Sequence, residues 1–323
     1  MNDSFKKIAK AIKKSANIAL VTHIGPDFDA LGSSLSLYYG LKQLGKKVSI
    51  FINDELSENQ KLLIDKNVIE KECDCTLFDL FISTDTPSRK RLGVYCDCFA
   101  NAKTSIVLDH HKNDDLKGTY NFVDTNSSSC SEISFKLLRA LKVNITKEIA
   151  SLLYMGLSAD TNSFVNSNTN KDSLLTAYKL VKLGANTSHI NEIQYRTQTL
   201  KEIELKKYLY NSYKMENDVA YCLVSYSDLK NLKARKADCD FYSSELISLQ
   251  GASIAFSVIE SSKNFYEISF RAKLGYDVRT IAEQLGGGGH IGAAGAKING
   301  ASIETVKDSI MNIVKKFESK KWE

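Results

Sequence analysis

Three charged residues, Asp109-His110-His111, directly follow the apolar run 104–108. A short run of β-branched and other apolar residues between polar ones is typical of a buried strand in a parallel sheet. The carboxyl end of such a strand lies at the edge where open α/β proteins bind their ligands. We therefore expect an acid and two imidazoles at a sheet edge, which favours a metal or phosphate site.

The same arrangement recurs after the strand-like runs 17–22 and 77–83 and after a helical segment, 147–158. The acidic and histidine residues at these four ends are His23, Asp27, Asp29, Asp85, Asp109, His110, His111 and Asp160. Four such coincidences are hard to explain as ordinary solvated loop ends. We therefore expect these side chains to meet in one site.

Imidazole nitrogens together with carboxylate oxygens suit Mn²⁺ or a similar ion better than Mg²⁺, which prefers oxygen ligands. The acids are numerous enough for two ions with a shared carboxylate, about 3.5–4 Å apart in such sites. Two ions can lower the pKa of a bound water towards neutrality and offset the charge of a displacement at phosphorus. The expected cofactor is therefore a pair of Mn²⁺ ions, and other divalent ions are compatible with these ligands.

Strand-like and helical segments alternate along the first half of the chain, which predicts an α/β fold with a parallel, helix-covered sheet. The length of 323 residues favours two domains. We expect a catalytic domain over 1–190, a helical connector over 191–215 and a smaller α/β substrate-binding domain over 216–323. The active site is expected in the cleft between the two domains.

The second domain ends in a run of four glycines, 286–289, followed by His290. Such a run is conformationally costly and could be a linker. A linker, however, should be flanked by polar sequence, and this run lies between an amphipathic helix and small apolar residues. Glycines beside a histidine suit a close approach of the backbone to a phosphate or a base, so we favour a ligand-binding role.

Bulk properties exclude some classes of protein. The chain has 43 basic and 38 acidic residues, a formal net charge of +5, which permits an anionic ligand without indicating a long nucleic-acid track. It has no apolar run of 18 residues and no signal-peptide core at its start. We therefore expect a cytoplasmic protein without a membrane segment.

Seven cysteines are present, four of them in two Cys-x-Cys pairs, Cys73/Cys75 and Cys96/Cys98. An odd number without a secretory segment argues against a disulfide framework. Four thiolates could hold zinc, but the usual spacing has two residues between the cysteines. We expect reduced, unlinked thiols, and zinc stays open as the alternative.

The charged motifs together resemble those of the DHH phosphoesterase superfamily. The matching residues are His23-x3-Asp27-x-Asp29, Asp85, Asp109-His110-His111 and Asp160. The Gly-Gly-Gly-Gly-His-x2-Ala-Ala-Gly run resembles the signature of the DHH-associated C-terminal domain. The resemblance covers essentially the whole chain and is similar to the stand-alone nanoRNase and pAp phosphatase group. Phe28 departs from the glycine common between the two aspartates, but no ligand is lost.

The resemblance implies a role for each residue of the site. One ion would be held by His23, Asp27 and Asp85, and the other by Asp29, Asp85, His110 and Asp160. Asp85 would bridge the ions, Asp109 would orient a ligand, and His111 would contact the substrate phosphate. Arg271 resembles the family's phosphate-clamping arginine, and Gly288, Gly289 and His290 would bind substrate beside it. Arg91 either pairs with the substrate or is an ordinary surface arginine.

The substrates implied are very short RNA or DNA oligonucleotides, linear dinucleotides such as pApA, or the nucleotide pAp. The alternatives are a cyclic dinucleotide phosphodiesterase, a RecJ-like single-strand exonuclease and an inorganic pyrophosphatase. The glycine run argues against pyrophosphate, which has no base to hold, and the chain leaves no room for the additional strand-binding domain usual in RecJ-type enzymes. A homodimer is compatible with the resemblance.

Overall fold

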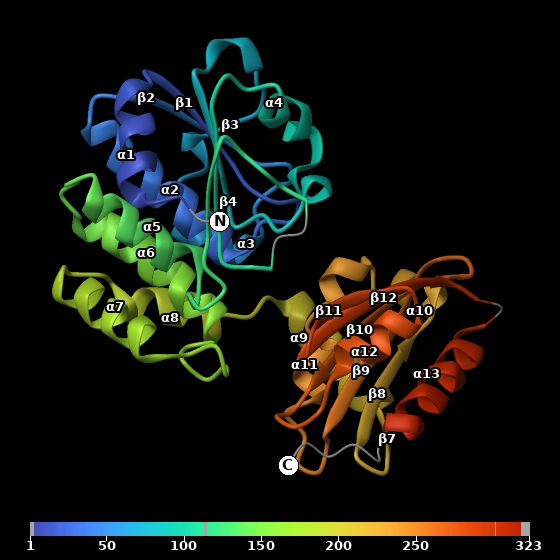
Figure 1. Cartoon of the computed structure of the whole chain (residues 1–323). Helices are drawn as coiled ribbons and strands as arrows, with labels where there is room; N and C mark the ends of the chain where they lie inside the picture. The colour runs from blue at the N-terminus through green and yellow to red at the C-terminus, as the bar shows by residue number, and fades with distance from the viewer. Residues whose placement is uncertain (1–2, 113–114, 301, 318–323) are drawn as a thin grey trace. The chain divides into compact units, whose positions relative to one another are not determined.

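The computed structural model describes residues 3–112, 115–300 and 302–317, so the last residues of the predicted second domain, 318–323, lie outside it. The chain divides into unit 1, Met1–Thr197, and unit 2, Gln198–Glu323. In Figure 1 the first runs from blue to yellow-green and the second from yellow to red. Within the described residues each unit contains a six-stranded sheet covered by helices. The predicted α/β class is confirmed.

The sheet of unit 1 is parallel throughout and has the order β3-β2-β1-β4-β5-β6. Its strands are β1 (Asn17–Val21), β2 (Lys47–Phe51), β3 (Ile69–Glu70), β4 (Leu80–Thr84), β5 (Ser105–Asp109) and β6 (Tyr120–Val123). The order changes direction between β1 and β4. The carboxyl ends of these two strands therefore form the crevice in which open α/β sheets bind ligands.

Alternation along β1 sends its side chains into two different cores. Ile18 and Leu20 join the larger core, whereas Ala19 and Val21 join the smaller one. The larger core is closed by α1 (Phe5–Lys14), α2 (Phe28–Gln43), α5 (Cys130–Ala140) and α6 (Lys147–Asp160). The smaller core is closed by the 3-10 segment η3 (Arg89–Tyr95) and α4 (Cys96–Ala100). Both faces are covered, which explains why these strands read as continuous apolar runs.

Some elements of unit 1 differ from expectation. The strands β3 and β6 and the helix α3 (Glu58–Leu63) were not predicted. Strand β3 has two residues, and all four residues of β6 are only half-buried. Such short edge strands carry too little apolar pattern to be found from sequence. The outer helices are α7 (Lys171–Lys182) and α8 (Thr187–Tyr195).

The sheet of unit 2 is mixed, with the order β11-β12-β10-β9-β8-β7. Only the β8–β9 pair is parallel among the described strands. The strands are β7 (Lys214–Glu216), β8 (Val219–Val224), β9 (Ile254–Ser262), β10 (Phe265–Ala272), β11 (Gly288–His290) and β12 (Ala293–Asn299).

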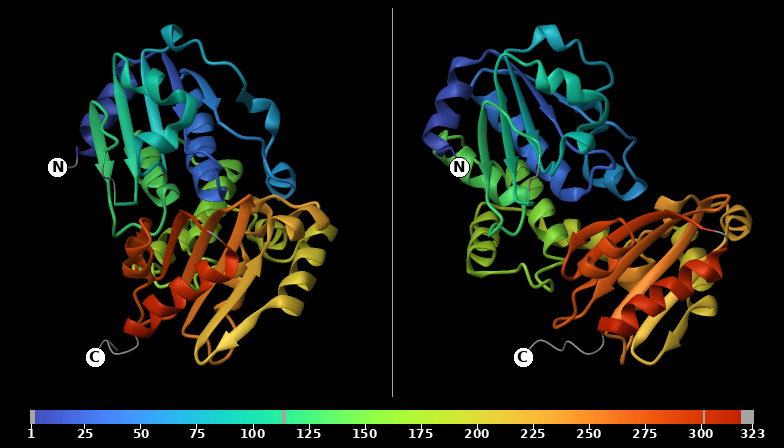
Figure 2. Two further views of the ribbon diagram at one scale, coloured as in Figure 1. Left: turned by 90° about the vertical axis from the view of Figure 1, so that its right-hand side faces the viewer. Right: turned by 45° about the vertical axis from the view of Figure 1, so that its right-hand side comes forward.

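Helices cover both faces of this second sheet (Figure 2). One face carries α12 (Val278–Gln284) and α13 (Ile303–Phe317), and the other carries α9 (Leu200–Ser212), α10 (Tyr226–Asn231) and α11 (Tyr242–Leu246). Helix α9 lies in the segment predicted as a connector. It packs through the buried Leu205 and Leu209 against Tyr242 and Leu246, and is therefore part of the core of unit 2.

The glycine run is part of the sheet, so the linker alternative is wrong. Gly288 to His290 form β11, which pairs with β12. A Cβ on Gly287 would lie 2.1 Å from the carbonyl oxygen of Gly295, and one on Gly289 would lie 2.6 Å from that of Ala293. These two glycines are therefore required by close packing against β12, whereas a Cβ on Gly288 would meet no atom within 4 Å.

Two of the cysteines, Cys75 and Cys98, are joined as a disulfide with their Cα atoms 5.3 Å apart. The expectation of unlinked thiols is wrong for this pair. The reason is topological, because the segment before β4 and helix α4 both pack on the smaller core of unit 1. Residues 23 positions apart in the chain are thereby brought side by side.

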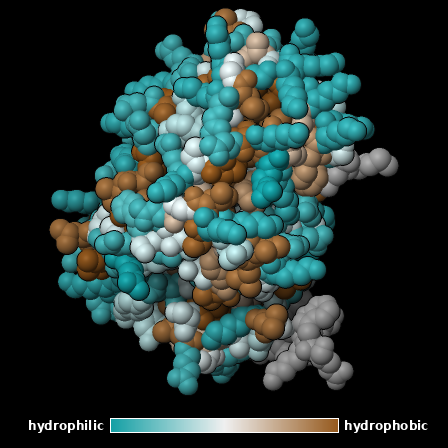
Figure 3. All heavy atoms as spheres, turned by 90° about the vertical axis from the view of Figure 1, so that its left-hand side faces the viewer, coloured by the Kyte–Doolittle hydropathy of each residue, from teal (hydrophilic) through white to brown (hydrophobic). Residues whose placement is uncertain are grey.

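In the part of the chain that the structure describes, no helix has both the length and the apolar character needed to span a bilayer. The face drawn in Figure 3 carries hydrophilic side chains with hydrophobic ones interspersed among them. Scattered apolar residues of this kind are usual on protein surfaces.

The packing of the glycine run gives a first prediction. Gly287→Ala should destabilise the chain by about 1–3 kcal/mol, because backbone atoms of β12 would have to move to admit the Cβ. Gly288→Ala, with open space around it, should change stability by less than about 0.5 kcal/mol. Urea unfolding midpoints of the two variants measure the difference. Equal stability of both would show that packing does not explain Gly287.

Candidate metal centre

The charged residues singled out in the sequence gather at the carboxyl edge of the first sheet. His23 follows β1, Asp85 follows β4, and Asp109 is the last residue of β5. Asp29 lies in the first turn of α2, and Asp160 is the last residue of α6. Because β1 and β4 flank the point where the strand order changes direction, these side chains surround the expected binding crevice.

Three groups of side chains each bring their ligand atoms within 4.8 Å of one another. The groups are His23, Asp27 and Asp85; Asp29, His110 and Asp160; and Asp85, His110 and His111. Asp85 and His110 each belong to two groups. The structure therefore joins the predicted ligands into one continuous cluster with Asp85 at its centre.

Asp85 is held in an unusual backbone conformation. Its φ of 55° lies in the left-handed region, which aspartate tolerates better than most residues but still at an energetic cost. Its N–H donates to the carbonyl of Leu108 at 2.9 Å, which continues the pairing of β4 with β5. The side chain is buried, with Oδ2 3.7 Å from Nε2 of His23 and Oδ1 3.4 Å from Nε2 of His110.

Asp27 and Asp29 are positioned by helix ends. Oδ1 of Asp27 caps α2 by accepting the N–H groups of Asp29 and Ala30 at 2.9 Å, while Oδ2 lies 3.7 Å from Nε2 of His23. Asp29 accepts the N–H groups of Cys130 at 2.6 Å and Ser131 at 2.9 Å, at the start of α5. One helix end thus orients each carboxylate, and the N-terminus of α5 favours the charged form of Asp29.

Asp109 organises the loop that carries the two histidines. Its Oδ1 accepts the N–H groups of His110 at 2.8 Å and His111 at 3.1 Å, and lies 3.0 Å from Nδ1 of His111. Nδ1 of His110 lies 3.2 Å from the carbonyl oxygen of Ser127. A proton on Nδ1 satisfies that carbonyl and leaves the Nε2 lone pair of His110 for the cluster.

The buried charges shift one another's proton affinity. Burial lowers the pKa of His23, but the carboxylates of Asp27 and Asp85 outweigh it and raise the pKa to about 10. Burial would raise the pKa of Asp85, but His110 and His23 hold it well below its usual value. Burial raises the pKa of Asp29 well above its usual value, reinforced by Asp85 and Asp160. Protonated imidazoles thus partly compensate the carboxylates, which repel one another in a site that needs a cation.

Two orphaned atoms show that the donor set fits a bound cation. Oδ1 of Asp85 and Nε2 of His110 are buried and have no hydrogen-bond partner among the described residues. Nε2 of His110 lies only 2.9 Å from Oδ2 of Asp160 without being aligned for a hydrogen bond. Atoms that crowd together without bonding one another converge on a shared point. Mixed nitrogen and oxygen donors of this kind bind divalent transition ions.

Arg91 is brought to the edge of the cluster. Its Nη2 lies 2.7 Å from Nδ1 of His23, and its carbonyl accepts the N–H of Ile24 at 2.8 Å. The side chain of Arg91 is exposed. An arginine at this place can reach an anion that binds beside His23.

The predicted substrate-binding residues of unit 2 share one face of its sheet. Arg271 of β10 and His290 of β11 are both in register with Ala293 of β12, from opposite sides. Residues directly opposite each other on antiparallel strands project to the same face. Arg271 donates from Nη1 to the carbonyl of Phe270 at 2.9 Å, and burial lowers the pKa of its guanidinium. A largely desolvated cation of this kind favours an anionic ligand.

Gly156 is a positioning residue that the sequence reasoning missed. A Cβ there would lie 2.5 Å from Oδ1 of Asp29 and 2.0 Å from Oγ of Ser131. Glycine therefore lets α6 approach α2 and α5 closely enough to place Asp160 near Asp29. The available signal was a lone glycine inside an otherwise apolar helical segment.

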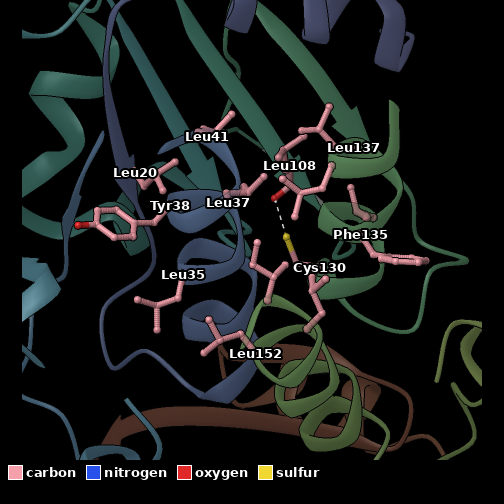
Figure 4. Packing of buried hydrophobic residues seen from close by; sticks show 14 of the residues in the cluster. Leu20, Leu35, Leu37, Tyr38, Leu41, Leu108, Cys130, Phe135, Leu137 and Leu152 are labelled. Atoms are coloured by element: carbon pink, nitrogen blue, oxygen red, sulfur yellow. Dashed lines mark hydrogen bonds between the residues drawn. The ribbon is translucent and has the colours of Figure 1, made fainter. Parts of the chain in front are cut away.

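Cys130 has no catalytic part, as expected. Its Sγ donates to the carbonyl of Leu108 at 3.2 Å within the larger core (Figure 4). Burial raises the pKa of this thiol well above its usual value. A neutral, fully packed thiol is a poor nucleophile.

Comparison with known proteins gives two family matches. The DHH family, N-terminal domain, matches residues 17–157, and the DHHA1 domain matches residues 218–320. The bifunctional oligoribonuclease and PAP phosphatase NrnA of Mycoplasma genitalium is 29% identical over 327 residues, covering 97% of this chain and 98% of that protein. The protein of the same name from Thermus thermophilus is 25% identical over 320 residues, covering 97% and 94%.

A solved structure shows the same fold. The exopolyphosphatase-related protein from Bacteroides fragilis superposes with a TM-score of 0.89 at 23% identity. The superposition covers 97% of this chain and 96% of that one. Nearly the whole chain therefore has counterparts in both sequence and structure.

The different surroundings of the two histidines predict different roles. His110→Ala should weaken Mn²⁺ binding at least about tenfold, because its Nε2 lies among the carboxylates. His111→Ala should retain the metal, because Asp109 occupies the Nδ1 atom that faces Asp85. Calorimetric titration of both variants with Mn²⁺ tests this, with His189→Ala, exposed on α8, as control. Equal loss of binding in both variants would make His111 a ligand as well.

Gly156 predicts an effect on the metal site from a residue that carries no ligand atom. Gly156→Ala should displace Asp29 and lower the affinity for Mn²⁺ by about 10–100-fold, as loss of supporting contacts does at metal sites. Gly184→Ala, at the end of α7, is the control because its Cβ would meet only the flexible side chain of Lys147. Unchanged Mn²⁺ affinity in a folded Gly156→Ala variant would contradict this account of the helix crossing.

Proposed function

Because the chain belongs to the DHH family and carries a DHHA1 domain, we propose that it hydrolyses very short oligonucleotides and the nucleotide pAp to mononucleotides. It is a hydrolase that acts on phosphoester bonds. The observation that carries the proposal is the Asp85-centred cluster, whose donors are those that metal-dependent phosphoester hydrolysis requires. The near-full-length similarity to proteins named oligoribonuclease and PAP phosphatase favours this substrate class.

The proposed cofactor is a pair of Mn²⁺ ions. His23, Asp27 and Asp85 would hold one, and Asp29, Asp85, His110 and Asp160 the other. The support is that Asp85 lies within ligand distance of both histidines that face it, from opposite oxygens of its carboxylate. Bound ions of this type polarise a phosphoryl oxygen and lower the pKa of water.

The remaining side chains orient the substrate in this proposal. Asp109 holds the ring of His111 through Nδ1, which places that ring beside the ligands for contact with the scissile phosphate. Arg91, next to His23, would pair with a second phosphate oxygen through its planar guanidinium. Arg271, Gly288, Gly289 and His290 of unit 2 would bind the part of the substrate away from the reacting phosphorus.

A short substrate follows from the charge and from the number of places that can grip it. The net charge of +5 is small for an enzyme that tracks a long strand, since each neutralised phosphate calls for a cation. The alternatives therefore rank below the short-oligonucleotide proposal: a cyclic dinucleotide phosphodiesterase, a RecJ-like exonuclease and an inorganic pyrophosphatase. Action in the cytoplasm and assembly as a homodimer stay predictions.

One substrate panel tests the proposal. With Mn²⁺, cleavage should be fastest on di- to pentanucleotides and should fall as the chain lengthens, and pAp should lose its 3′-phosphate. Product chromatography at a fixed enzyme concentration measures the rates. Pyrophosphate and cyclic dinucleotides, run in parallel, should be poor substrates.

Asp85→Asn is the matched negative control for that panel. Asparagine tolerates the left-handed backbone and keeps the volume but removes the charge, so all activity should fall by more than about 100-fold. Asp172→Asn, exposed on α7, should retain full activity. Faster, processive degradation of a long single strand by the unmodified chain would favour the RecJ-like alternative instead.

A further inference from the structure

Three thiols meet on the smaller core of unit 1, away from every charged residue of the metal centre. Cys73 and Cys75 lie in the segment between β3 and β4, and Cys98 lies in α4. The sulfur atoms of all three are within 4.8 Å of one another. Two segments distant in the sequence thus contribute to one group of thiols, which neither the phosphoesterase chemistry nor the family resemblance uses.

The surroundings of this thiol group exclude much of the solvent. Cys73, Cys75 and Cys98 are all half-buried and pack against the core that contains Phe51, Phe81 and Phe99. The segments that carry them have little regular structure, being a 3-10 turn at Cys75–Leu77 and the short helix α4. A crosslink between them would therefore stabilise a part of the fold that backbone hydrogen bonding holds weakly.

A disulfide between Cys75 and Cys98 uses two of the three sulfurs and gives no reason for the third. A thiolate site for a metal ion uses all three. Sulfur donors select soft ions such as Zn²⁺, with Zn–S distances of about 2.3 Å. Tetrahedral sulfurs around zinc lie about 3.8 Å apart at that bond length, so the three sulfurs need only small shifts to surround an ion.

We propose that Cys73, Cys75 and Cys98 of the reduced chain form a structural Zn²⁺ site. Binding exchanges the thiol protons for the ion: three S–H groups release three protons to solvent, and three Zn–S bonds form without oxidation or reduction. Solvent completes the tetrahedral set. The disulfide between Cys75 and Cys98 is the oxidised alternative, in which the ion is absent.

Cys96 is not part of this site, although it belongs to the second Cys-x-Cys pair. It lies two residues before Cys98 on α4, and residues two apart on a helix do not face one another. Its sulfur is accordingly not in the group of three. Cys96 is half-buried against the same core, which makes it a matched control for the three proposed ligands.

The site is separate from the catalytic cluster. Cys75 precedes β4, and α4 precedes β5, so the thiols lie towards the amino ends of these strands. The charged cluster lies at their carboxyl ends. Loss of the zinc ion should therefore lower stability and leave the Mn²⁺ affinity of the catalytic cluster unchanged.

Cobalt substitution tests the proposal on the full chain, reduced and freed of metal. Co²⁺ bound by thiolates gives a sulfur-to-cobalt charge-transfer band that nitrogen and oxygen ligands do not give. We expect that band in the unmodified chain and its displacement by one equivalent of Zn²⁺. Cys96→Ser should keep the band. A reduced chain that binds Co²⁺ without it would overturn the proposal.

Cys73→Ser separates a metal site from a disulfide, because Cys73 takes no part in the Cys75–Cys98 bond. Zinc affinity should fall at least about tenfold in this variant, and a thiophilic chelator should lower the melting temperature of the unmodified chain but not that of Cys73→Ser. Unchanged zinc content in Cys73→Ser, or a metal-free Cys75–Cys98 disulfide in chain alkylated directly on cell lysis, would show that the thiols serve only as a disulfide.

Discussion

The mutual repulsion of the carboxylates around Asp85 is the constraint on which unit 1 depends. Asp85 is buried and charged, its backbone is in the left-handed region, and Asp29 and Asp160 lie close to it. No apolar packing could stabilise such a group alone. Strand pairing, two helix N-termini and the crossing of α6 over α2 hold the charges in place, and a cation is the partner that relieves their repulsion.

The parts of this arrangement that follow from local sequence could be predicted. Apolar runs that end in Asp or His placed β1, β4 and β5, and parallel strands bring their carboxyl ends to one edge whatever the loops between them do. The motif residues therefore had to meet. The edge strands β3 and β6 and the left-handed turn at Asp85 could not be found, because each depends on tertiary pairing rather than on a pattern within a few residues.

Glycines show the same limit from the other side. The sequence pointed to a ligand at 286–289, whereas packing against β12 already accounts for Gly287 and Gly289. Gly156 was passed over, yet any side chain there would collide with Asp29. Glycine marks a close approach in both places, and the sequence does not say whether a ligand, a strand or a ligand-bearing helix makes it. Only Gly288, with open space beside it, keeps the ligand explanation without a competing structural one.

The cysteines and the charged cluster divide the first sheet by the chemistry of their donors. Nitrogen and oxygen donors occupy the carboxyl ends of the strands, where exchangeable ions and anionic substrates must enter. The three thiols occupy the side of the amino ends, packed on aromatic residues. Soft thiolates placed among the carboxylates would compete for the catalytic ions and favour zinc over manganese. Keeping the two donor sets at opposite edges of one sheet allows both kinds of site in a single unit.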